Sequence, residues 1–171
     1  MKTIRLKSVD STNNYAKRIS NTEASDVLII ADEQLAGRGQ YDRSWFSEVG
    51  KSITMSYLLK SKKITSLRIN EELPRIISDA INEYCDIKTE VVEPNDIYLN
   101  DKKICGLLIE ANYIGDKMDN IIVGIGINVS NNAFPDEISE RASSIYLETG
   151  KKIPNKEIIG AITHAIEGRL K

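Results

Sequence analysis

The sequence predicts an α+β fold, a single domain in which helices pack on a mixed, mostly antiparallel central sheet. One long segment, residues 66–85, repeats apolar residues at helical spacing, and three strand-like runs joined by short polar turns follow it. No repeat and no Pro/Gly/Ser-rich linker divides the 171 residues, which suffice for one sizeable core and are too few for two ordinary domains. We therefore expect residues 1–171 to form one domain.

The N-terminal part alternates strands with one short helix. "TIRLKSV" predicts a strand, and Asp10 or Ser11 offers an N-cap for a helix through "TNNYAKRIS". "DVLIIAD" predicts a buried strand, and the alternating, β-branched run "KSITMSYLL" predicts the next one. The glycine-containing loop "EQLAGRGQYDRSWF", residues 33–46, is therefore held between two strands.

The rest of the chain begins and ends with helices. "SLRINEELPRIISDAINEYC" predicts a long helix, with apolar residues from Leu67 to Tyr84 at helical spacing, which Pro74 should kink or restart. "EVVEPNDIYLN", "KKICGLLIEANYI" and "NIIVGIGINVS" predict three neighbouring antiparallel strands. "PDEISERASSIYLETG" predicts short helix and loop, and Pro154 should start a final helix that runs to Lys171.

Composition excludes several classes of function. Lys and Arg total 23 against 25 Asp and Glu, and a net charge of −2 provides no general field for nucleic acid. No apolar run is long enough to span a bilayer, and the amino terminus has no secretory signal. Cys85 and Cys105 suit a reducing cytoplasm, and a lone histidine, His164, makes Ser/His and Cys/His catalysis hard to build. We expect a cytoplasmic protein with no nucleic-acid or membrane partner.

The loop at residues 33–46 has the chemistry of an anion site. Gly37 and Gly39 let the backbone turn and let a ligand approach its N–H groups. Arg38 and Arg43 supply guanidinium groups, whose planar arrangement of donors suits phosphate or carboxylate. Its spacing matches neither GxxxxGK[ST] nor a helix-opening GxGxxG, which argues against the phosphate-loop and dinucleotide-binding classes. Taken alone, a tight turn with two solvated arginines is the more common structure for such a pattern.

A second polar group lies in "EPNDIYLNDKKICGLLIE". Pro94 restricts the backbone, Asn95 and Asp96 present short polar groups, and Lys103 precedes Gly106 in an apolar strand. A lysine entering a buried strand can reach an anionic ligand as a point charge. The alternative is an edge lysine that discourages strand pairing.

The third pattern, "VGIGINVS", has two glycines inside a strand, followed by a polar residue. Glycine within a strand usually marks a bulge or the close approach of a ligand or backbone, so Gly124 and Gly126 indicate such an approach beside Asn128. The alternative is a simple strand bend.

Together these segments resemble the catalytic domain of biotin protein ligases, which attach biotin to a lysine of biotin-dependent carboxylases. The resemblance covers roughly residues 9–145, and it is specific because five motifs occur in the family's order. They are "VDSTNNYAK", "EQLAGRGQYDRSWFS", "PNDIYLNDKKICGLLIE", "GIGINV" and "ASSI". The fold implied is that shared by biotin and lipoate ligases and similar to class II aminoacyl-tRNA synthetases.

The resemblance also implies a role for each site residue. Biotin would be bound by Ser11, Thr12, Asn13, Gln34, Gly37, Arg38, Lys103 and Gly106. The nucleotide would be bound by Arg38, Gly39, Arg43, Trp45, Asn95, Asp96 and Asn128. Arg38 and Lys103 would be the catalytic residues, and Mg²⁺ would enter with ATP near Asp96.

The family's reaction has two steps. Biotin and MgATP form biotinyl-adenylate, and a lysine of a biotin carboxyl carrier protein then accepts the biotin. The resemblance therefore implies biotin, ATP and Mg²⁺ as ligands and the carrier protein as partner, and it allows a homodimer.

The sequence departs from the family pattern at two places. Gln40 and Asp42 replace an Arg and a Gly of the loop, and Val92 and Glu93 replace a Lys and a Trp before Pro94. The chain also lacks the family's N-terminal DNA-binding domain and C-terminal β-barrel, so we expect no repressor function. Three hypotheses stay open: a minimal monofunctional biotin protein ligase, a weakly active or non-catalytic biotin-binding sensor or subunit, and a lipoate or octanoate transferase.

Overall fold

A seven-stranded sheet with the order β1-β2-β3-β7-β6-β5-β4 organises the chain in a computed structural model that describes residues 1–41, 43–60 and 66–169. β1 runs parallel to β2, and all other neighbours are antiparallel. The strands are β1 (Lys2–Val9), β2 (Val27–Gln34), β3 (Ser52–Leu59), β4 (Glu90–Val92), β5 (Asp96–Leu99), β6 (Lys102–Ile114) and β7 (Lys117–Asn128). The predicted α+β class with a mixed, mostly antiparallel sheet is confirmed.

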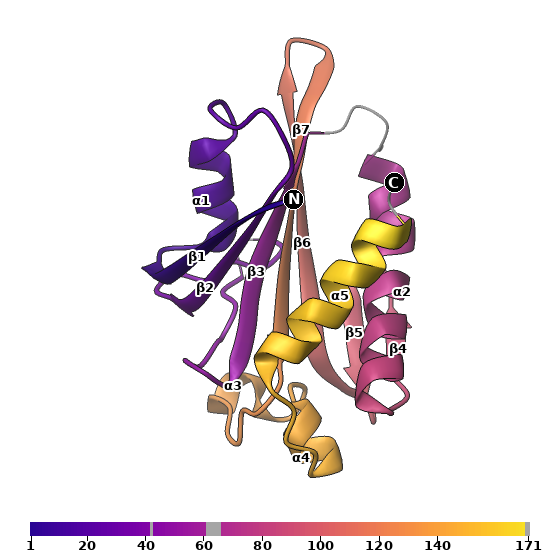
Figure 1. Ribbon diagram of the computed structural model, residues 1–171. Helices are drawn as coiled ribbons and strands as arrows, with labels where there is room; N and C mark the ends of the chain where they lie inside the picture. Colours follow the sequence, from indigo (N-terminus) through magenta and orange to yellow (C-terminus); the bar gives the residue numbers. More distant parts are fainter. Residues whose placement is uncertain (42, 61–65, 170–171) are drawn as a thin grey trace.

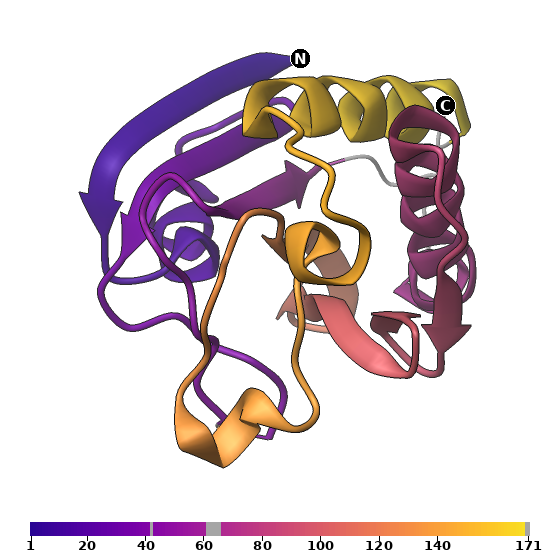
Figure 2. The same ribbon diagram turned by 90° about the horizontal axis from the view of Figure 1, so that it is seen from below.

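Helices cover both faces of this sheet (Figures 1 and 2). The helices of the described ranges are α1 (Thr12–Ile19), α2 (Ser66–Cys85), α3 (Asp136–Ser139), α4 (Ile145–Thr149) and α5 (Asn155–Arg169), of which α3 and α4 lie at one end of the sheet (Figure 1). α1 packs on one face, where Ala16 meets Ile29, Leu58 and Ile122. α2 and α5 pack on the other face and on each other, over the larger core. None of the helices in the described ranges is long and apolar enough to cross a bilayer.

Burial on both faces explains the composition of the central strands. Every residue of β3 is buried, and β2 is buried from Val27 to Ala31. Side chains alternate between faces, so Tyr57 belongs to the core under α2 and α5 while its neighbour Leu58 belongs to the core under α1. Edge strand β1 is mostly exposed outside Val9.

Two predicted elements differ from the structure. The run "EVVEPNDIYLN" forms two antiparallel strands, β4 and β5, rather than one, since Pro94 has no N–H for a sheet ladder and the chain turns there. α2 runs unbroken across Pro74, so a restart is wrong; its apolar face, which includes Leu73, Ile77 and Ile81, is buried and offsets the lost hydrogen bond. The final helix begins at Asn155, one residue after Pro154, and residues 170 and 171 lie outside the described ranges.

A buried tyrosine joins α5 to the sheet. The hydroxyl groups of Tyr57 and Thr163 are 3.0 Å apart. Burial raises the pKa of Tyr57 to about 12 from its usual value near 10. Its proton is therefore lost from the unfolded chain at lower pH than from the folded protein.

This shift predicts a pH-dependent stability. As pH rises from about 10 to about 12, the unfolded state binds fewer protons than the folded state at Tyr57, so the free energy of unfolding should fall. In Tyr57→Phe this contribution should be absent, and urea denaturation at pH 9 and pH 11 measures the difference. The exposed Tyr113→Phe is the control and should keep the wild-type pH dependence. An equal loss of stability in Tyr57→Phe and wild type would contradict the assignment.

Candidate active site

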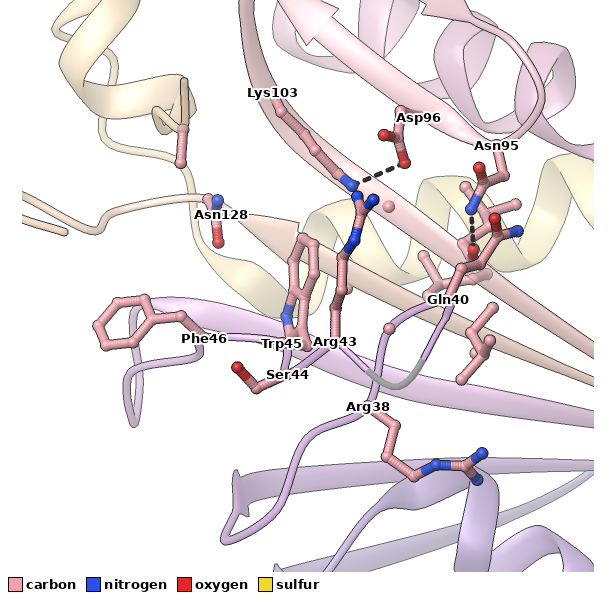
Figure 3. A pocket seen from close by; sticks show the side chains of 18 of the residues that line it. Arg38, Gln40, Arg43, Ser44, Trp45, Phe46, Asn95, Asp96, Lys103 and Asn128 are labelled. Atoms are coloured by element: carbon pink, nitrogen blue, oxygen red, sulfur yellow. Dashed lines mark hydrogen bonds and ion pairs between the residues drawn. The ribbon is translucent and has the colours of Figure 1, made fainter. Parts of the chain in front are cut away.

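One cavity of about 380 Å³ collects the predicted site residues (Figure 3). It lies where the loop between β2 and β3 meets the start of α1, strands β5 to β7, and the segment after β7. All the predicted residues except Gly37 line it: Ser11, Thr12, Asn13, Gln34, Arg38, Gly39, Arg43, Trp45, Asn95, Asp96, Lys103, Gly106 and Asn128. Residues up to 117 positions apart in the sequence, from Ser11 to Asn128, thus converge on one space.

A buried polar cluster forms the wall beside α1. The side-chain carbonyl oxygen of Gln34 accepts hydrogen bonds from the Thr12 amide at 2.8 Å and the Thr12 hydroxyl at 3.0 Å. Ser56 on β3 donates toward the Thr12 hydroxyl at 2.7 Å and the Asn13 carbonyl oxygen at 2.6 Å. These bonds leave the Gln34 amide nitrogen, a donor, for a ligand. The prediction missed Ser56, which supports the wall without lining the cavity.

The two glycines of β7 make room for side chains. A methyl group on Gly124 would collide with the Asn13 side-chain amide, and one on Gly126 would collide with the Trp45 indole. Both glycines keep regular pairing with β3 and β6. This regular pairing argues against a bulge, and the close approach is made by these two side chains.

Trp45 and Asn128 each hold a buried polar atom without a hydrogen-bond partner among the described residues. These atoms are the Trp45 indole nitrogen, a donor, and the Asn128 side-chain oxygen, an acceptor. The Asn128 amide nitrogen donates one hydrogen to the Ser143 carbonyl at 3.1 Å. Buried polar groups are normally satisfied, so an unpaired donor and acceptor lining the same cavity indicate a ligand.

Lys103 presents its ammonium group to the cavity. It forms an ion pair with Asp96 at 2.7 Å and lies 5.6 Å from the centre of the Trp45 ring. β6 pairs with β5 at Lys103, and Ala142 bridges to Lys103 as well. The alternative of an edge lysine is thus wrong, because neighbours lie beside this backbone position.

The two arginines of the loop point in different directions (Figure 3). The guanidinium of Arg38 donates to the Asn14 side chain at 2.9 Å and to Glu110 at 3.2 Å, away from Lys103. Arg43 instead extends alongside Trp45 toward Lys103 (Figure 3). In this conformation Arg38 faces the α1 side of the cavity and Arg43 the lysine side.

The loop between them is a narrow backbone turn. Gly39 donates to the Arg43 carbonyl at 2.7 Å, and Trp45 donates to the Gly37 carbonyl at 2.9 Å. A methyl group on Gly37 would lie 2.7 Å from the Trp45 carbonyl oxygen. Gly37 therefore does not line the cavity, in contrast to the other predicted residues, and its lack of a side chain lets the turn close.

The departures from the family pattern lie in different surroundings. Gln40 lines the cavity, whereas Asp42 lies outside the described residues. Glu93 makes an exposed ion pair with Arg75 at 3.4 Å, and Val92 is exposed. Neither Val92 nor Glu93 lines the cavity, so Glu93 places no opposing charge in it.

The thiols and carboxylates offer little for a resident metal. Within the described ranges no three His, Cys, Asp or Glu side chains come together, and Asp96 is the one carboxylate among the described lining residues. Cys85 and Cys105 are buried free thiols, and burial raises the pKa of both, that of Cys85 to about 11. Neither cysteine is a thiolate at neutral pH.

The sequence prediction missed the residues contributed by the segment after β7. Phe134, Ile138, Arg141 and Ala142 line the cavity, and the Phe134 ring meets the Phe46 ring edge-on at 5.8 Å. The motif "ASSI" pointed to this segment. No local pattern singled out Arg141, because its proximity to Lys103 arises from backbone pairing across 38 residues.

A mixed sheet that carries a polar, cation-lined cavity over its glycine-containing strand is typical of an enzyme domain for a small anionic ligand. The sequence profile of the biotin/lipoate A/B protein ligase family matches residues 6–128. The chain belongs to this family.

Individual relatives cover nearly the whole chain. The bifunctional ligase/repressor BirA of Bacillus subtilis is 34% identical over 170 residues, which are 95% of this chain and 52% of BirA. The biotin--[acetyl-CoA-carboxylase] ligase of Paracoccus denitrificans is 25% identical over 94% of this chain and 69% of its own length. Biotin protein ligase from Aquifex aeolicus, solved in complex with biotin and ATP, superposes with a TM-score of 0.86 at 34% identity, covering 99% of this chain and 70% of that one. The chain thus spans about half the length of its BirA relatives.

The contact between Trp45 and Gly126 predicts a spectroscopic change. In Gly126→Ala the new methyl group would displace the indole, and Trp45 is the only tryptophan, so its fluorescence emission should shift to longer wavelength. Overpacking of this kind should also lower the free energy of unfolding by about 1–3 kcal/mol. Gly160→Ala, on α5 with open space around it, is the control and should leave the emission unchanged. An unshifted spectrum in a folded Gly126→Ala would contradict the contact.

Proposed function

We propose that this chain is the catalytic unit of a biotin protein ligase, which forms biotinyl-5'-adenylate from biotin and ATP and transfers the biotin to a lysine of a biotin carboxyl carrier domain. The observation that carries this proposal is the coexistence, in one cavity, of the Lys103 ammonium with the unpaired polar atoms of Trp45 and Asn128. A lysine suits a carboxylate or phosphate, and an unpaired donor and acceptor beside an aromatic ring suit a heterocyclic base.

Adenylation makes negative charge develop at the α-phosphate. An oxygen of the biotin carboxylate attacks the α-phosphorus, the bond to the β-phosphate breaks, and pyrophosphate leaves with the electron pair. Lys103 would release Asp96 and hold the carboxylate and α-phosphate oxygens, since a preorganised cation stabilises this charge. Arg38 would leave Glu110 for the same oxygens when the loop closes.

Base recognition would depend on Asn128 and Trp45. The unpaired atom of the Asn128 side chain is its acceptor oxygen, while its amide nitrogen already donates one hydrogen to the Ser143 carbonyl. An exocyclic amino group, as in adenine, would donate to this unpaired oxygen. The Trp45 ring would provide an apolar surface for the base.

The wall beside α1 would bind the biotin head. The ureido group of biotin has both donors and an acceptor, and Ser11, Thr12, Asn13 and Gln34 present matching polar groups. The orientation of the Gln34 amide, set by Thr12, directs a donor toward a carbonyl oxygen. The apolar part of biotin would lie against the lining residues Met55, Leu107 and Ile125 beside Gly106.

Mg²⁺ fits this site as a companion of ATP rather than as a resident ion. Mg²⁺ keeps several waters and is usually held by one or two carboxylates together with substrate phosphates. Asp96 is the single carboxylate of the described lining, and Asn95 lies beside it, with its amide bonded to the Leu107 carbonyl. The ion would neutralise phosphate charge, with Asp96 as its protein ligand.

Transfer to the carrier would use the same geometry. The neutral acceptor amine attacks the acyl carbon of biotinyl-adenylate, the bond to AMP breaks, and AMP leaves while the amine loses a proton. Arg43 and Lys103 would hold the leaving phosphate. The two free, buried cysteines suit a reducing compartment, so we propose the cytoplasm as the place of this reaction.

A weakly active or non-catalytic biotin binder is the second candidate. Gln40 in the cavity lining and Val92 outside it supply no positive charge at the two positions where the family pattern has Lys or Arg. The two functions separate experimentally: biotin-dependent ATP–pyrophosphate exchange requires adenylation, whereas calorimetric binding of biotin does not. Binding without exchange would exclude the ligase and favour the binder, and exchange with lipoate in place of biotin would favour the acyl-transferase hypothesis.

The role of Lys103 predicts a selective loss of activity. Lys103→Ala should lower the rate of biotin-dependent pyrophosphate exchange by about 10²–10³-fold, as for loss of an oxyanion-stabilising group. The free energy of unfolding should change by about 1 kcal/mol or less, since the Lys103–Asp96 pair is partly exposed. Lys102→Ala, the neighbouring lysine outside the cavity lining, is the control. Equal exchange rates in the two variants would remove Lys103 from the proposed mechanism.

Position 92 allows a gain-of-function test. Val92 pairs with Asp96 across β4 and β5, so the two side chains lie on the same face. In Val92→Lys the new cation should share Asp96 and release Lys103 for the ligand, and the exchange rate should rise severalfold. Val92→Gln, similar in length but uncharged, should leave the rate unchanged. If both variants behave alike, the missing charge does not limit adenylation.

A further inference from the structure

Positive charge exceeds negative charge in the described lining of the cavity. Its cationic side chains are Arg38, Arg43, Lys103 and Arg141, whereas Asp96 is the one carboxylate of the described lining. Glu110 neutralises Arg38, and Asp96 neutralises Lys103. Such an excess suits a ligand with more than one negative charge.

Arg43 and Arg141 account for the excess. In the part of the chain that the structure describes, neither guanidinium forms an ion pair with a carboxylate. Arg43 lies 5.8 Å from the centre of the exposed Tyr41 ring. Both arginines are exposed at the cavity, so they can meet an anion without first losing a protein partner.

The backbone holds Arg141 beside Lys103. The Lys103 amide donates to the Arg141 carbonyl at 2.9 Å, and the Ser143 amide donates to the Lys103 carbonyl at 3.0 Å. The Arg141 amide donates to the Ile138 carbonyl at 3.0 Å, which ties it to the end of α3. Arg141 is thus carried on a backbone segment that pairs with β6 and is itself part of the cavity lining.

The same segment also reaches the residue proposed to bind the base. Asn128 donates to the Ser143 carbonyl at 3.1 Å, two residues after Arg141. Arg141 therefore lies on a backbone segment that is hydrogen-bonded both to Lys103, on the reacting side, and to Asn128, on the base side. A nucleotide with its base at Asn128 and its α-phosphate at Lys103 would therefore run past this segment, with the α-phosphate next to it.

We propose that Arg141 is a phosphate-binding residue of this cavity, which contacts the phosphates of ATP beside Lys103 and stabilises the negative charge that develops on them during adenylation. The inference rests on the proposed function for the identity of the nucleotide. A guanidinium fork matches two phosphate oxygens and keeps its charge at all physiological pH values. Its stabilisation grows as negative charge accumulates on the phosphate oxygens.

Calorimetry with inorganic pyrophosphate, ATP and biotin as separate probes tests this role. Arg141→Ala should bind pyrophosphate and ATP about tenfold more weakly than wild type, while biotin binding stays unchanged. Arg141→Lys should recover part of the affinity, because it restores the charge without the fork. Arg5→Ala removes an exposed arginine from edge strand β1, outside the cavity, and should bind all three probes as wild type does.

The readouts separate this inference from the proposed function. Wild-type affinity for pyrophosphate in a folded Arg141→Ala overturns the role of Arg141, as does a wild-type protein that binds neither pyrophosphate nor ATP. Equal weakening of biotin and pyrophosphate binding would indicate a general structural effect and would also overturn it. A wild-type protein that binds pyrophosphate through Arg141 but shows no biotin-dependent exchange would exclude the ligase while leaving the phosphate site standing.

Discussion

The site depends on the absence of side chains at two positions of β7. Gly124 and Gly126 allow Asn13 and Trp45 to lie directly against a central strand. Asn13 then donates to the Leu108 carbonyl at 3.2 Å and to Glu110 at 2.8 Å, which joins α1 to β6. Trp45 brings the loop between β2 and β3 over the sheet. Two walls of the cavity are thus built on backbone that larger residues would cover.

Two cations of the cavity, Lys103 and Arg38, can exchange their carboxylate partners for an anionic ligand. Lys103 with Asp96 and Arg38 with Glu110 are partly exposed ion pairs, and such pairs contribute about 0–1 kcal/mol each. An anionic ligand can therefore replace the carboxylates at small cost. The contacts that it gains are stronger when it also excludes water from the cavity. The buried bonds of Thr12 and Gln34, by contrast, keep their geometry during this exchange.

The cavity extends beyond the part of the chain that defines the family. The family profile ends at residue 128, whereas Phe134 and Arg141 lie in the following segment. Backbone hydrogen bonds with Lys103 and a hydrogen bond from the Asn128 side chain connect this segment to the motifs that resemble the family. Substitutions there can change the lining of the cavity without changing the sheet.

The sequence by itself determined the fold class, the span of α2 and a set of site residues of which all but Gly37 line the cavity, because periodicity and the chemistry of Gly, Pro and Asn are local properties. It could not determine what depends on which segments lie side by side. The tertiary structure decided that Arg38 pairs with Glu110, 72 residues away, and that Arg141 lies beside Lys103. It also decided that Pro94 separates two strands and that Gly37 lies in a tight turn against Trp45 outside the cavity lining. These outcomes follow from long-range pairing and close packing, which no short stretch of residues encodes.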